Sequence, residues 1–375
     1  MASTFQNIKI HVRIFLIFML LSSILIAGCS PKNALLSEET ISVTDMSGRI
    51  VDVPKEVDEI VCIGPGALRL ITYLQATDKV VGIEGGFEKD SSTGRPYIMA
   101  HPELTELPVI GIAAPSPQFN PEAIININPD VIFACYVEPR IADNLQKQIG
   151  IPVVILSYGD LSTFKNEHVF NSLKIAGKIL SKTERAEAVI NFIKSSQEDL
   201  TERTKHISVR PTVYVGGLGY KGTQGILSTQ REYPAFEILN VKNVVNELDM
   251  RGHIFIDKEQ LIQWNPDFIF VDGGGISRVR EDHIKNPEFY NLLKAAQNGQ
   301  VYALFPYNFY TTNIDTALAN TYYIGKILYP QEFSDIDPAK KADEIYEFLV
   351  GKPLYEAMAK EWDAFKKFKI SGENK

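Results

Sequence analysis

The chain has 375 residues, of which 45% are apolar, 10% aromatic and 22% charged. This length is enough for two ordinary domains with cores of their own, and this composition excludes a disordered or low-complexity chain. Without residues 1–28, whose charged residues are Lys9 and Arg13, 36 basic residues face 46 acidic ones and the net charge is −10. An acidic balance of this size disfavours nucleic acid as a partner.

The first 28 residues have the pattern of a secretory signal peptide. Lys9 and Arg13 precede an apolar, acid-free run from Ile14 to Gly28. This run is short for a membrane-spanning helix and ends at small residues, as signal peptides do. The alternative is a signal anchor with a buried cysteine. The segment Ile26 to Cys29 resembles a bacterial lipobox, and this resemblance implies that Cys29 receives a lipid.

Short β-branched runs alternate with helical stretches after a polar tether over residues 29–45. The first series predicts strands at 59–64, 79–84, 130–136 and 152–158 and helices at 67–76, 121–128 and 140–150. The second predicts strands at 212–217, 267–273 and 301–305 and helices at 233–241, 258–265 and 287–299. Such alternation is typical of parallel sheets covered by helices. We therefore expect an N-terminal α/β lobe over 46–163 and a C-terminal α/β lobe with terminal helices over 207–375.

The two series contain a matching segment. Phe119–Phe133 aligns without a gap on Ile256–Phe270, with a glutamate at the fourth position of each and Asn-Pro-Asp before an apolar strand. Chance repetition of Asn-Pro-Asp is the alternative. The same order of helix, turn and strand around both copies favours a duplicated lobe.

Residues 164–206 connect the lobes and contain a predicted helix. Apolar residues recur at the spacing of one helix face, at Ala186, Val189, Ile190 and Ile193. Ser181 and Glu184 match a capping box at its start. A helix over 182–204 has a length of about 34 Å. Such a strut predicts little relative motion of the lobes, whereas a Gly/Ser-rich linker predicts a large hinge motion.

The cysteines and histidines do not suggest a metal site. Cys62 and Cys135 lie in apolar, strand-like runs and are either buried free thiols or one disulfide. The five histidines after residue 28 are widely scattered, at His101, His168, His206, His253 and His283. We therefore predict no resident metal and no cofactor.

The lipoprotein signal, the two similar lobes and the single long connecting helix together resemble the class III substrate-binding proteins of ABC importers. The segment from Asp45 to Pro54 is similar to a recurrent opening of that family, with matches at Gly48, Arg49, Val51 and Val53. The resemblance covers the mature chain and implies two Rossmann-like lobes joined by one long α-helix. It also implies a monomeric, lipid-anchored extracytoplasmic receptor for a ferric siderophore, haem, cobalamin, or molybdate or tungstate.

The resemblance assigns a partner to the repeated glutamates. In that family each lobe presents one surface glutamate to an arginine pocket on the permease dimer, and the matching residues are Glu122 and Glu259. The alternative is a local role, because an acid near a helix N-terminus gains about 0.3–1 kcal/mol from the helix dipole.

The ligand site is expected between the lobes, where loops follow the carboxyl ends of the strands. Arginine and tyrosine are frequent there and suit an anion, because guanidinium groups pair with oxyanions and phenols donate hydrogen bonds or stack on flat rings. The alternative to ligand contact is a solvated side chain for each arginine and a position at the edge of the core for each tyrosine. Arg69 is the strongest candidate, since it follows the first strand and a Gly-Pro-Gly turn. The full set is Arg69, Arg95, Tyr136, Arg140, Tyr220, Arg231, Tyr307 and Tyr310.

Segment 217–222 matches the G-x-G-x-x-G fingerprint of dinucleotide-binding enzymes. That site requires a helix that starts at the third glycine and an acid at a strand end about 20 residues further on. The residues after 222 have poor helical periodicity, and Glu237 falls inside a predicted helix. We therefore predict a tight loop that directs Tyr220 and Lys221 toward the cleft.

Motifs of other enzymes are equally lacking, since the sequence contains no G-x-S-x-G, H-E-x-x-H or P-loop motif. We predict a receptor, not an enzyme, whose ligand is an anionic iron(III) complex. A molybdate or tungstate oxyanion is the alternative ligand, and an NAD-dependent enzyme is a distant alternative.

Overall fold

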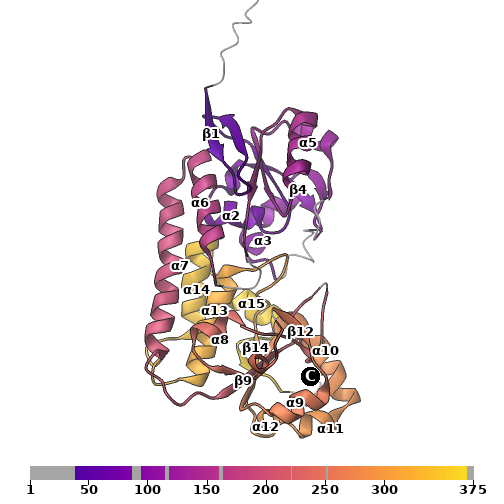
Figure 1. The fold of residues 1–375 in the computed structure, drawn as a ribbon, viewed down its shortest axis with the longest axis vertical. Coiled ribbons are helices and arrows are strands. Elements are labelled where there is room, and N and C mark those ends of the chain that lie inside the picture. The colour runs from indigo at the N-terminus through magenta and orange to yellow at the C-terminus, as the bar shows by residue number, and fades with distance from the viewer. Residues whose placement is uncertain are drawn as a thin grey trace, which may run out of the picture. The chain divides into compact units, whose positions relative to one another are not determined.

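The computed structural model describes residues 39–86, 94–114, 118–159, 164–220, 222–250 and 252–369. The expected signal peptide, Cys29 and Lys221 lie outside these residues. The described part contains two α/β lobes and a set of helices between them (Figure 1). This architecture confirms the predicted fold.

The N-terminal lobe is built on a six-stranded sheet in the order β6-β5-β4-β3-β7-β8. The parallel strands are β3 (Ile60–Ile63), β4 (Val80–Gly85), β5 (Val109–Ile112), β7 (Val131–Cys135) and β8 (Val153–Leu156), and β6 (Gln118–Phe119) is antiparallel. Its helices are α2 (Ala67–Tyr73), η1 (Thr77–Lys79), α3 (Pro96–Ala100), η3 (Pro102–Glu106), α4 (Pro121–Ile127) and α5 (Pro139–Ile149). Strands β3, β7 and β8 are buried throughout, which explains their unbroken apolar sequences.

An antiparallel hairpin of β1 (Thr40–Thr44) and β2 (Ile50–Pro54) precedes this sheet. The tether that the sequence predicted to continue to residue 45 therefore ends earlier. Asp45 holds the turn: its Oδ1 accepts the N–H of Arg49 at 3.0 Å and its Oδ2 pairs with the Arg49 guanidinium at 2.9 Å. The same carboxylate accepts the N–H of Ile155, which fixes the hairpin to β8.

The C-terminal lobe has a five-stranded sheet in the order β11-β9-β13-β14-β15. The parallel strands are β9 (Thr212–Gly216), β11 (Lys242–Asn243), β13 (Phe268–Asp272) and β14 (Val301–Leu304), and β15 (Lys366–Lys367) is antiparallel. Strands β10 (Ser228–Gln230) and β12 (His253–Phe255) form a separate ribbon. Its helices are α8 (Pro234–Ile238), η4 (Val244–Glu247), α9 (Lys258–Trp264), η5 (Gly273–Gly275), α10 (Ile276–Lys285), α11 (Pro287–Asn291) and α12 (Lys294–Gln297). The helix predicted over 233–241 is thus shorter, and the one predicted over 287–299 is divided in two.

The repeated segments have the same structure in both lobes. Helices α4 and α9 each end at an asparagine with a left-handed backbone, Asn128 (φ 54°) and Asn265 (φ 40°). Asparagine adopts this conformation more readily than most residues. The aspartates that follow, Asp130 and Asp267, each accept a 2.8 Å hydrogen bond from a peptide N–H at or directly before the start of the neighbouring strand, those of Glu59 and Thr212. The two repeated segments therefore fold alike.

The lobes are connected by α6 (Glu167–Ile179) and the 22-residue helix α7 (Thr183–Thr204). The apolar face predicted from the sequence is the buried face of α7. The predicted capping box is wrong: no side chain caps α7, and Ser181 has a left-handed backbone with φ 56°.

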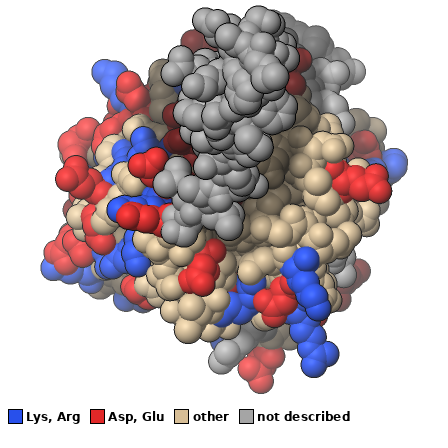
Figure 2. All heavy atoms as spheres, turned by 90° about the horizontal axis from the view of Figure 1, so that it is seen from above, with Lys and Arg blue, Asp and Glu red and all other residues tan. Residues whose placement is uncertain are grey.

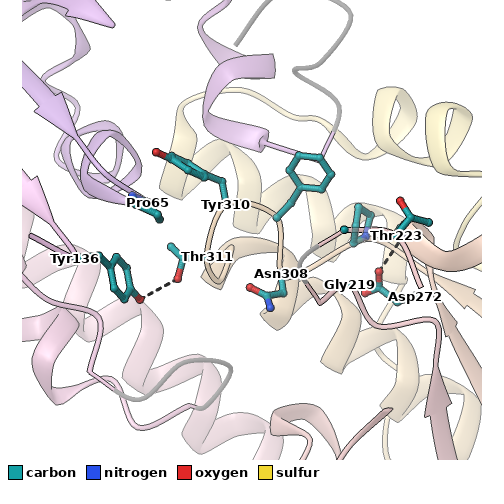
Figure 3. Close-up of a pocket in the computed structure, with 12 residues that line it drawn as sticks. Pro65, Tyr136, Gly219, Thr223, Asp272, Asn308, Tyr310 and Thr311 are labelled. Carbon is teal, nitrogen blue, oxygen red and sulfur yellow. Dashed lines mark hydrogen bonds between the residues drawn. The ribbon is translucent and has the colours of Figure 1, made fainter. Parts of the chain in front are cut away.

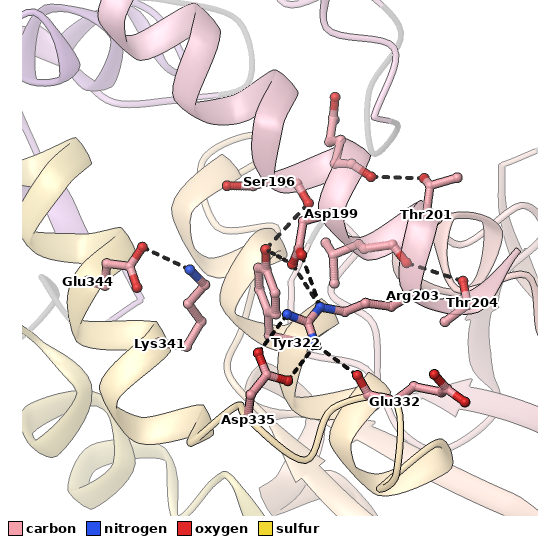
Figure 4. A network of polar contacts seen from close by, with 12 residues as sticks. Ser196, Asp199, Thr201, Arg203, Thr204, Tyr322, Glu332, Asp335, Lys341 and Glu344 are labelled. Carbon is pink, nitrogen blue, oxygen red and sulfur yellow. Dashed lines mark hydrogen bonds and ion pairs between the residues drawn. The ribbon is translucent and has the colours of Figure 1, made fainter.

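The C-terminal helices are α13 (Ile314–Leu328), α14 (Pro338–Val350) and α15 (Tyr355–Trp362). A polar network joins α7 to α13 and to the segment between α13 and α14 (Figure 4). Arg203 on α7 binds both carboxylate oxygens of Asp335, at 2.7 and 2.8 Å, and also pairs with Asp199. The hydroxyl of Tyr322 on α13 donates to Asp199 at 2.8 Å. The long helix is therefore held along its side and at its end.

The C-terminal helices also contact the N-terminal lobe. Helix α14 packs against α2 and α3. The ring of His101 lies 2.9 Å from the carbonyl oxygen of Val350, and Arg185 on α7 donates to the carbonyl of Tyr73.

Acidic and basic side chains are interspersed on the face shown in Figure 2. Within the described ranges, no helix has the length and apolar character needed to cross a membrane.

Candidate functional site: a cavity between the lobes

A cavity of about 470 Å³ lies where loops of the two lobes meet (Figure 3). The loops follow the carboxyl ends of β3, β7, β9, β13 and β14, as the sequence predicted. The N-terminal lobe contributes Pro65 and Tyr136 to the lining. The C-terminal lobe contributes Gly219, Gly222, Thr223, Asp272, Gly274, Pro306, Asn308, Phe309, Tyr310 and Thr311. This volume is within the range of about 300–1,000 Å³ that is usual for small-molecule sites.

Three of the lining residues have a strained backbone. Tyr136, Tyr310 and Thr311 all have positive φ angles, of 56°, 54° and 67°. This conformation costs a non-glycine residue about 1–3 kcal/mol, and it is least favourable for a β-branched side chain such as Thr311. The hydroxyls of Tyr136 and Thr311 lie 3.1 Å apart and join the two lobes (Figure 3). Strain of this kind, retained at a cavity wall, is typical of a functional site.

Tyr310 makes a second contact between the lobes. Its hydroxyl donates to Oε2 of Glu84 at 3.0 Å, and Oε1 of Glu84 accepts the N–H of Gly64 at 3.0 Å. Burial raises the pKa of Glu84 to about 7, although these two donors and the nearby charge of Arg95 favour the ionised form. Glu84 therefore titrates near neutral pH while it holds the Tyr310 ring in place.

Arg69 does not line the cavity. It is fully buried, and its guanidinium donates to the carbonyl oxygens of Thr312 at 3.0 Å and Tyr310 at 3.1 Å. It also donates to the carbonyls of Phe309 and Thr311. Arg69 was the strongest ligand candidate from the sequence. In the structure it instead holds the 309–312 loop, which forms the cavity wall contributed by the C-terminal lobe.

Of the eight predicted ligand residues, Tyr136 and Tyr310 line the cavity. Two others are buried nearby: Tyr307 donates to the side chain of Gln230 at 2.9 Å, and Arg95 donates to the carbonyl of Gly86 at 2.9 Å and lies over the rings of Phe309 and Tyr310.

The other three are nearer the surface. Arg140 is the exposed second residue of α5, Arg231 is half-buried after β10, and Tyr220 stacks on His253 with ring centroids 4.2 Å apart. No arginine or lysine is found among the described residues of the lining. The structure therefore does not assemble the arginine-rich wall that the sequence suggested.

Asp272 is a charged lining residue that the sequence prediction missed. It ends β13, is 3% exposed, and its Oδ1 accepts the N–H of Gly274 at 2.9 Å. Its Oδ2 makes no hydrogen bond with any described residue. Burial raises the pKa of this carboxyl group to about 7, while the peptide N–H groups of Gly274 and Tyr307 oppose the shift. The sequence signal that could have identified Asp272 is an acid at the end of an apolar strand, directly before three glycines.

Close packing explains the glycines around this aspartate. A Cβ atom on Gly275 would lie 2.4 Å from the carbonyl oxygen of Gly217, and one on Gly273 would lie 2.9 Å from that of Leu304. Gly217 begins the 217–222 match to the dinucleotide fingerprint and has φ 76°. In the described residues after this segment, the next helix begins only at Pro234, so the helix that a pyrophosphate requires is not formed there.

Glu122 and Glu259 occupy equivalent positions in the two lobes. Each is the exposed second residue of its helix, α4 or α9. The helices are capped in the same way, since the side chains of Asn120 and Asp257 accept peptide N–H groups of the first turn. Both glutamates are therefore accessible at equivalent positions of the two lobes, and their docking role stays a prediction.

The thiols and metal-binding side chains add no second site. Cys62 and Cys135 are both free and buried. Over the described ranges, no group of three or more His, Cys, Asp or Glu side chains is arranged to hold a metal ion.

Two related proteins resemble this chain over most of its length. The molybdate-binding protein MolA of Haemophilus influenzae is 23% identical over 326 residues, which cover 81% of this chain and 89% of that protein. The uncharacterized ABC transporter substrate-binding lipoprotein YvrC of Bacillus subtilis is 22% identical over 329 residues, which cover 84% and 97%.

Solved structures show the same fold. A periplasmic solute binding protein from Veillonella parvula superimposes with a TM-score of 0.70 at 22% identity, over 86% of this chain and 96% of that one. MolA bound to molybdate superimposes with a TM-score of 0.65 at 20% identity, over 84% and 98%. Residues 60–307 match the family model described as periplasmic binding protein. The chain therefore belongs to the periplasmic binding protein family, with the class III fold.

Proposed function

We propose that this receptor binds an iron(III) complex of the siderophore type and delivers it to its ABC permease. The observation that carries the proposal is the cavity of about 470 Å³ walled by Tyr136, Phe309 and Tyr310. A cavity of this size suits a ligand as large as a drug molecule. Aromatic side chains provide broad apolar contact for the organic shell of a chelate, and the tyrosine hydroxyls orient it.

Molybdate or tungstate is the second candidate ligand. The similarity to MolA over 81% of the chain favours it. A small tetrahedral oxyanion is best held by several converging N–H donors. The side chains that line this cavity instead include a carboxylate and three aromatic rings, which is why the chelate is our first choice.

Calorimetric titration of the mature chain tests the proposal. The ligand series contains ferric trihydroxamate and tris-catecholate complexes, haem, cobalamin, molybdate and tungstate, and iron-free chelators serve as controls. We expect at least one ferric complex to bind and its iron-free chelator to bind more weakly. Tight binding of an oxyanion without binding of any iron complex would establish the second candidate instead.

Two tyrosine variants provide a matched comparison within this experiment. Tyr136→Ala removes a lining ring, whereas Tyr220→Ala removes an exposed ring that does not line the cavity. We expect the first to weaken ligand binding by more than about tenfold and the second to change it by no more than about twofold. Equal effects would show that the ligand lies elsewhere.

The proposal also covers how the receptor is anchored to the membrane and how it docks on the permease. We assign Cys29 as the lipid-modified residue that keeps the receptor at the extracytoplasmic face of the membrane. We assign Glu122 and Glu259 as the permease-docking residues, supported by their equivalent, exposed positions. The chain acts by binding and release and performs no catalysis. An NAD titration without a binding signal is the expected result.

A further inference from the structure

Asp272 lines the interlobe cavity, and one oxygen of its carboxylate is buried without a hydrogen-bond partner among the described residues. The side chain lines the cavity but is 3% exposed, so solvent has little access to it. Oδ1 accepts the N–H of Gly274 and Oδ2 accepts no hydrogen bond from a described residue, although the peptide N–H of Tyr307 is close enough to favour the ionised carboxylate. A buried carboxylate oxygen without a donor is costly, and native proteins retain such groups where function or a bound water, ion or ligand compensates for the missing partner.

The backbone around Asp272 keeps this oxygen in place. The carboxylate caps the N-terminus of η5 through Gly274, and Gly273 and Gly275 leave no room for side chains against the neighbouring loops. The side chain is therefore fixed by the turn that follows β13 before any ligand arrives. A preorganised acceptor of this kind discriminates between ligands by the donor that they offer.

No lysine or arginine side chain is among the described residues that line the cavity beside Asp272. The guanidinium of Arg69 is bound to backbone carbonyls of the 309–312 loop, and that of Arg95 donates to the carbonyl of Gly86. The other polar side chains of the described lining are the uncharged groups of Tyr136, Thr223, Asn308, Tyr310 and Thr311. A ligand that enters this cavity therefore meets one carboxyl group together with hydroxyl and amide groups.

We propose that Asp272 is a specificity-determining residue that accepts a hydrogen bond from an N–H or O–H group of the ligand. The receptor consequently selects iron complexes of neutral or positive charge that carry such a donor and rejects polyanionic complexes. This inference rests on the proposed function and replaces the anionic ligand expected from the sequence. Ferric trihydroxamates belong to the selected class because their three ligand charges neutralise the metal, whereas ferric tris-catecholates are trianions.

Three ferric complexes are used to distinguish the effect of ligand charge on affinity from the effect of ligand shape. The ferric complex of desferrioxamine B is a cation with a pendant ammonium group, its N-acetylated derivative keeps the same iron centre without that charge, and a ferric tris-catecholate is a trianion. Titrations are made at about pH 8, where most of Asp272 is ionised given its pKa of about 7. We expect the wild-type protein to bind the cation most tightly and the trianion at least about tenfold more weakly.

Asp272→Asn tests the residue itself. This variant keeps the shape of the side chain and removes its charge, so we expect the affinity for the cation to fall by about ten- to a hundredfold. The loss for the acetylated complex should be smaller, and binding of the trianion should improve. Glu281→Gln is the matched control, because it removes an acid from the exposed surface of α10, which follows η5. We expect it to leave all three affinities unchanged.

Each outcome distinguishes the two proposals. Binding of the trianion as tight as that of the cation, or unchanged affinities in a folded Asp272→Asn protein, overturns the role of Asp272 while the iron receptor stands. Failure of every iron complex to bind overturns the receptor proposal itself. The wild-type series decides the charge preference even where the variant does not fold, which circular dichroism reports.

Discussion

The hydroxyl of Tyr310 donates a 3.0 Å hydrogen bond to Oε2 of Glu84, and this bond links the C-terminal lobe to the N-terminal one. Because burial raises the pKa of Glu84 from 4.5 to about 7, the folded protein holds this proton more tightly than the unfolded chain does. The stabilisation is complete below about pH 4.5 and is lost as the pH rises through about 7. Asp272 contributes with the same sign, since its pKa is also raised to about 7.

We predict that the ligand-free receptor is less stable at about pH 8 than at about pH 5. The contribution of Glu84 is on the order of 3 kcal/mol at most, from the size of its shift. Glu84→Gln should reduce this difference, because an amide carries no charge to bury, and Glu281→Gln should not. Urea unfolding at the two pH values measures it. A pH dependence that Glu84→Gln leaves intact would contradict this assignment.

Replacement of Arg69 should destabilise the protein strongly. Arg69→Met removes the buried donor of four carbonyl groups in the 309–312 loop, and we expect the free energy of unfolding to fall by about 3–5 kcal/mol. Arg140→Met, at an exposed position, should change it by less than about 0.5 kcal/mol. Chemical denaturation of both variants gives the comparison. A loss below about 1 kcal/mol for Arg69→Met would show that its hydrogen bonds are replaced by water.

Two adjacent glycines should respond differently to the same substitution. Gly275→Ala places a Cβ 2.4 Å from a backbone oxygen, so one of the two loops must move, whereas the nearest atom to a Cβ on Gly274 is a side-chain oxygen at 3.2 Å. We expect a loss of about 2–3 kcal/mol for Gly275→Ala and less than half of that for Gly274→Ala. Thermal unfolding of the two variants measures the difference. Similar melting temperatures would mean that the contact between Gly217 and Gly275 is readily opened.

Charge reversal of the docking glutamates should separate transport from binding. Glu122→Lys and Glu259→Lys place cations where an arginine pocket is expected, so we predict that the double variant loses uptake in cells and keeps its ligand affinity. Glu356→Lys is the matched control, because Glu356 is also the exposed second residue of a helix, α15. Uptake of the radiolabelled complex and calorimetry on the purified protein give the two measurements. A loss of ligand affinity in the double variant would contradict the docking role.

The sequence predicted the lobes well because their strands are buried on both faces. Segments such as Val131–Cys135 are unbroken apolar runs, and the repeated Asn-Pro-Asp gives both lobes the same turn before such a strand. Strand β1 was missed because it is short and three of its five residues, Thr40, Ser42 and Thr44, are polar like the tether before them. Helix lengths were overestimated where apolar residues continue past the last helical turn, as after Ile238.

The site was harder to predict because its contacts are distant in sequence. Arg69 looked like a ligand residue because it closely follows the first strand and a Gly-Pro-Gly turn, yet its partner Thr312 lies 243 positions away. Asp272 was overlooked because acids were not sought in a site thought to bind an anion. Asp272 is buried because β13 is the central strand of its sheet. The position of a strand in a sheet depends on the whole fold and cannot be read from the local sequence.

The bonds from Arg69 to the 309–312 loop also have a consequence for folding. These contacts join residues 243 positions apart, so they exist only when both lobes are folded and in contact. The loop that carries Tyr310 and Thr311 is therefore held in its strained conformation by the other lobe. Binding activity consequently reports that both lobes, and not one of them alone, have reached the native state.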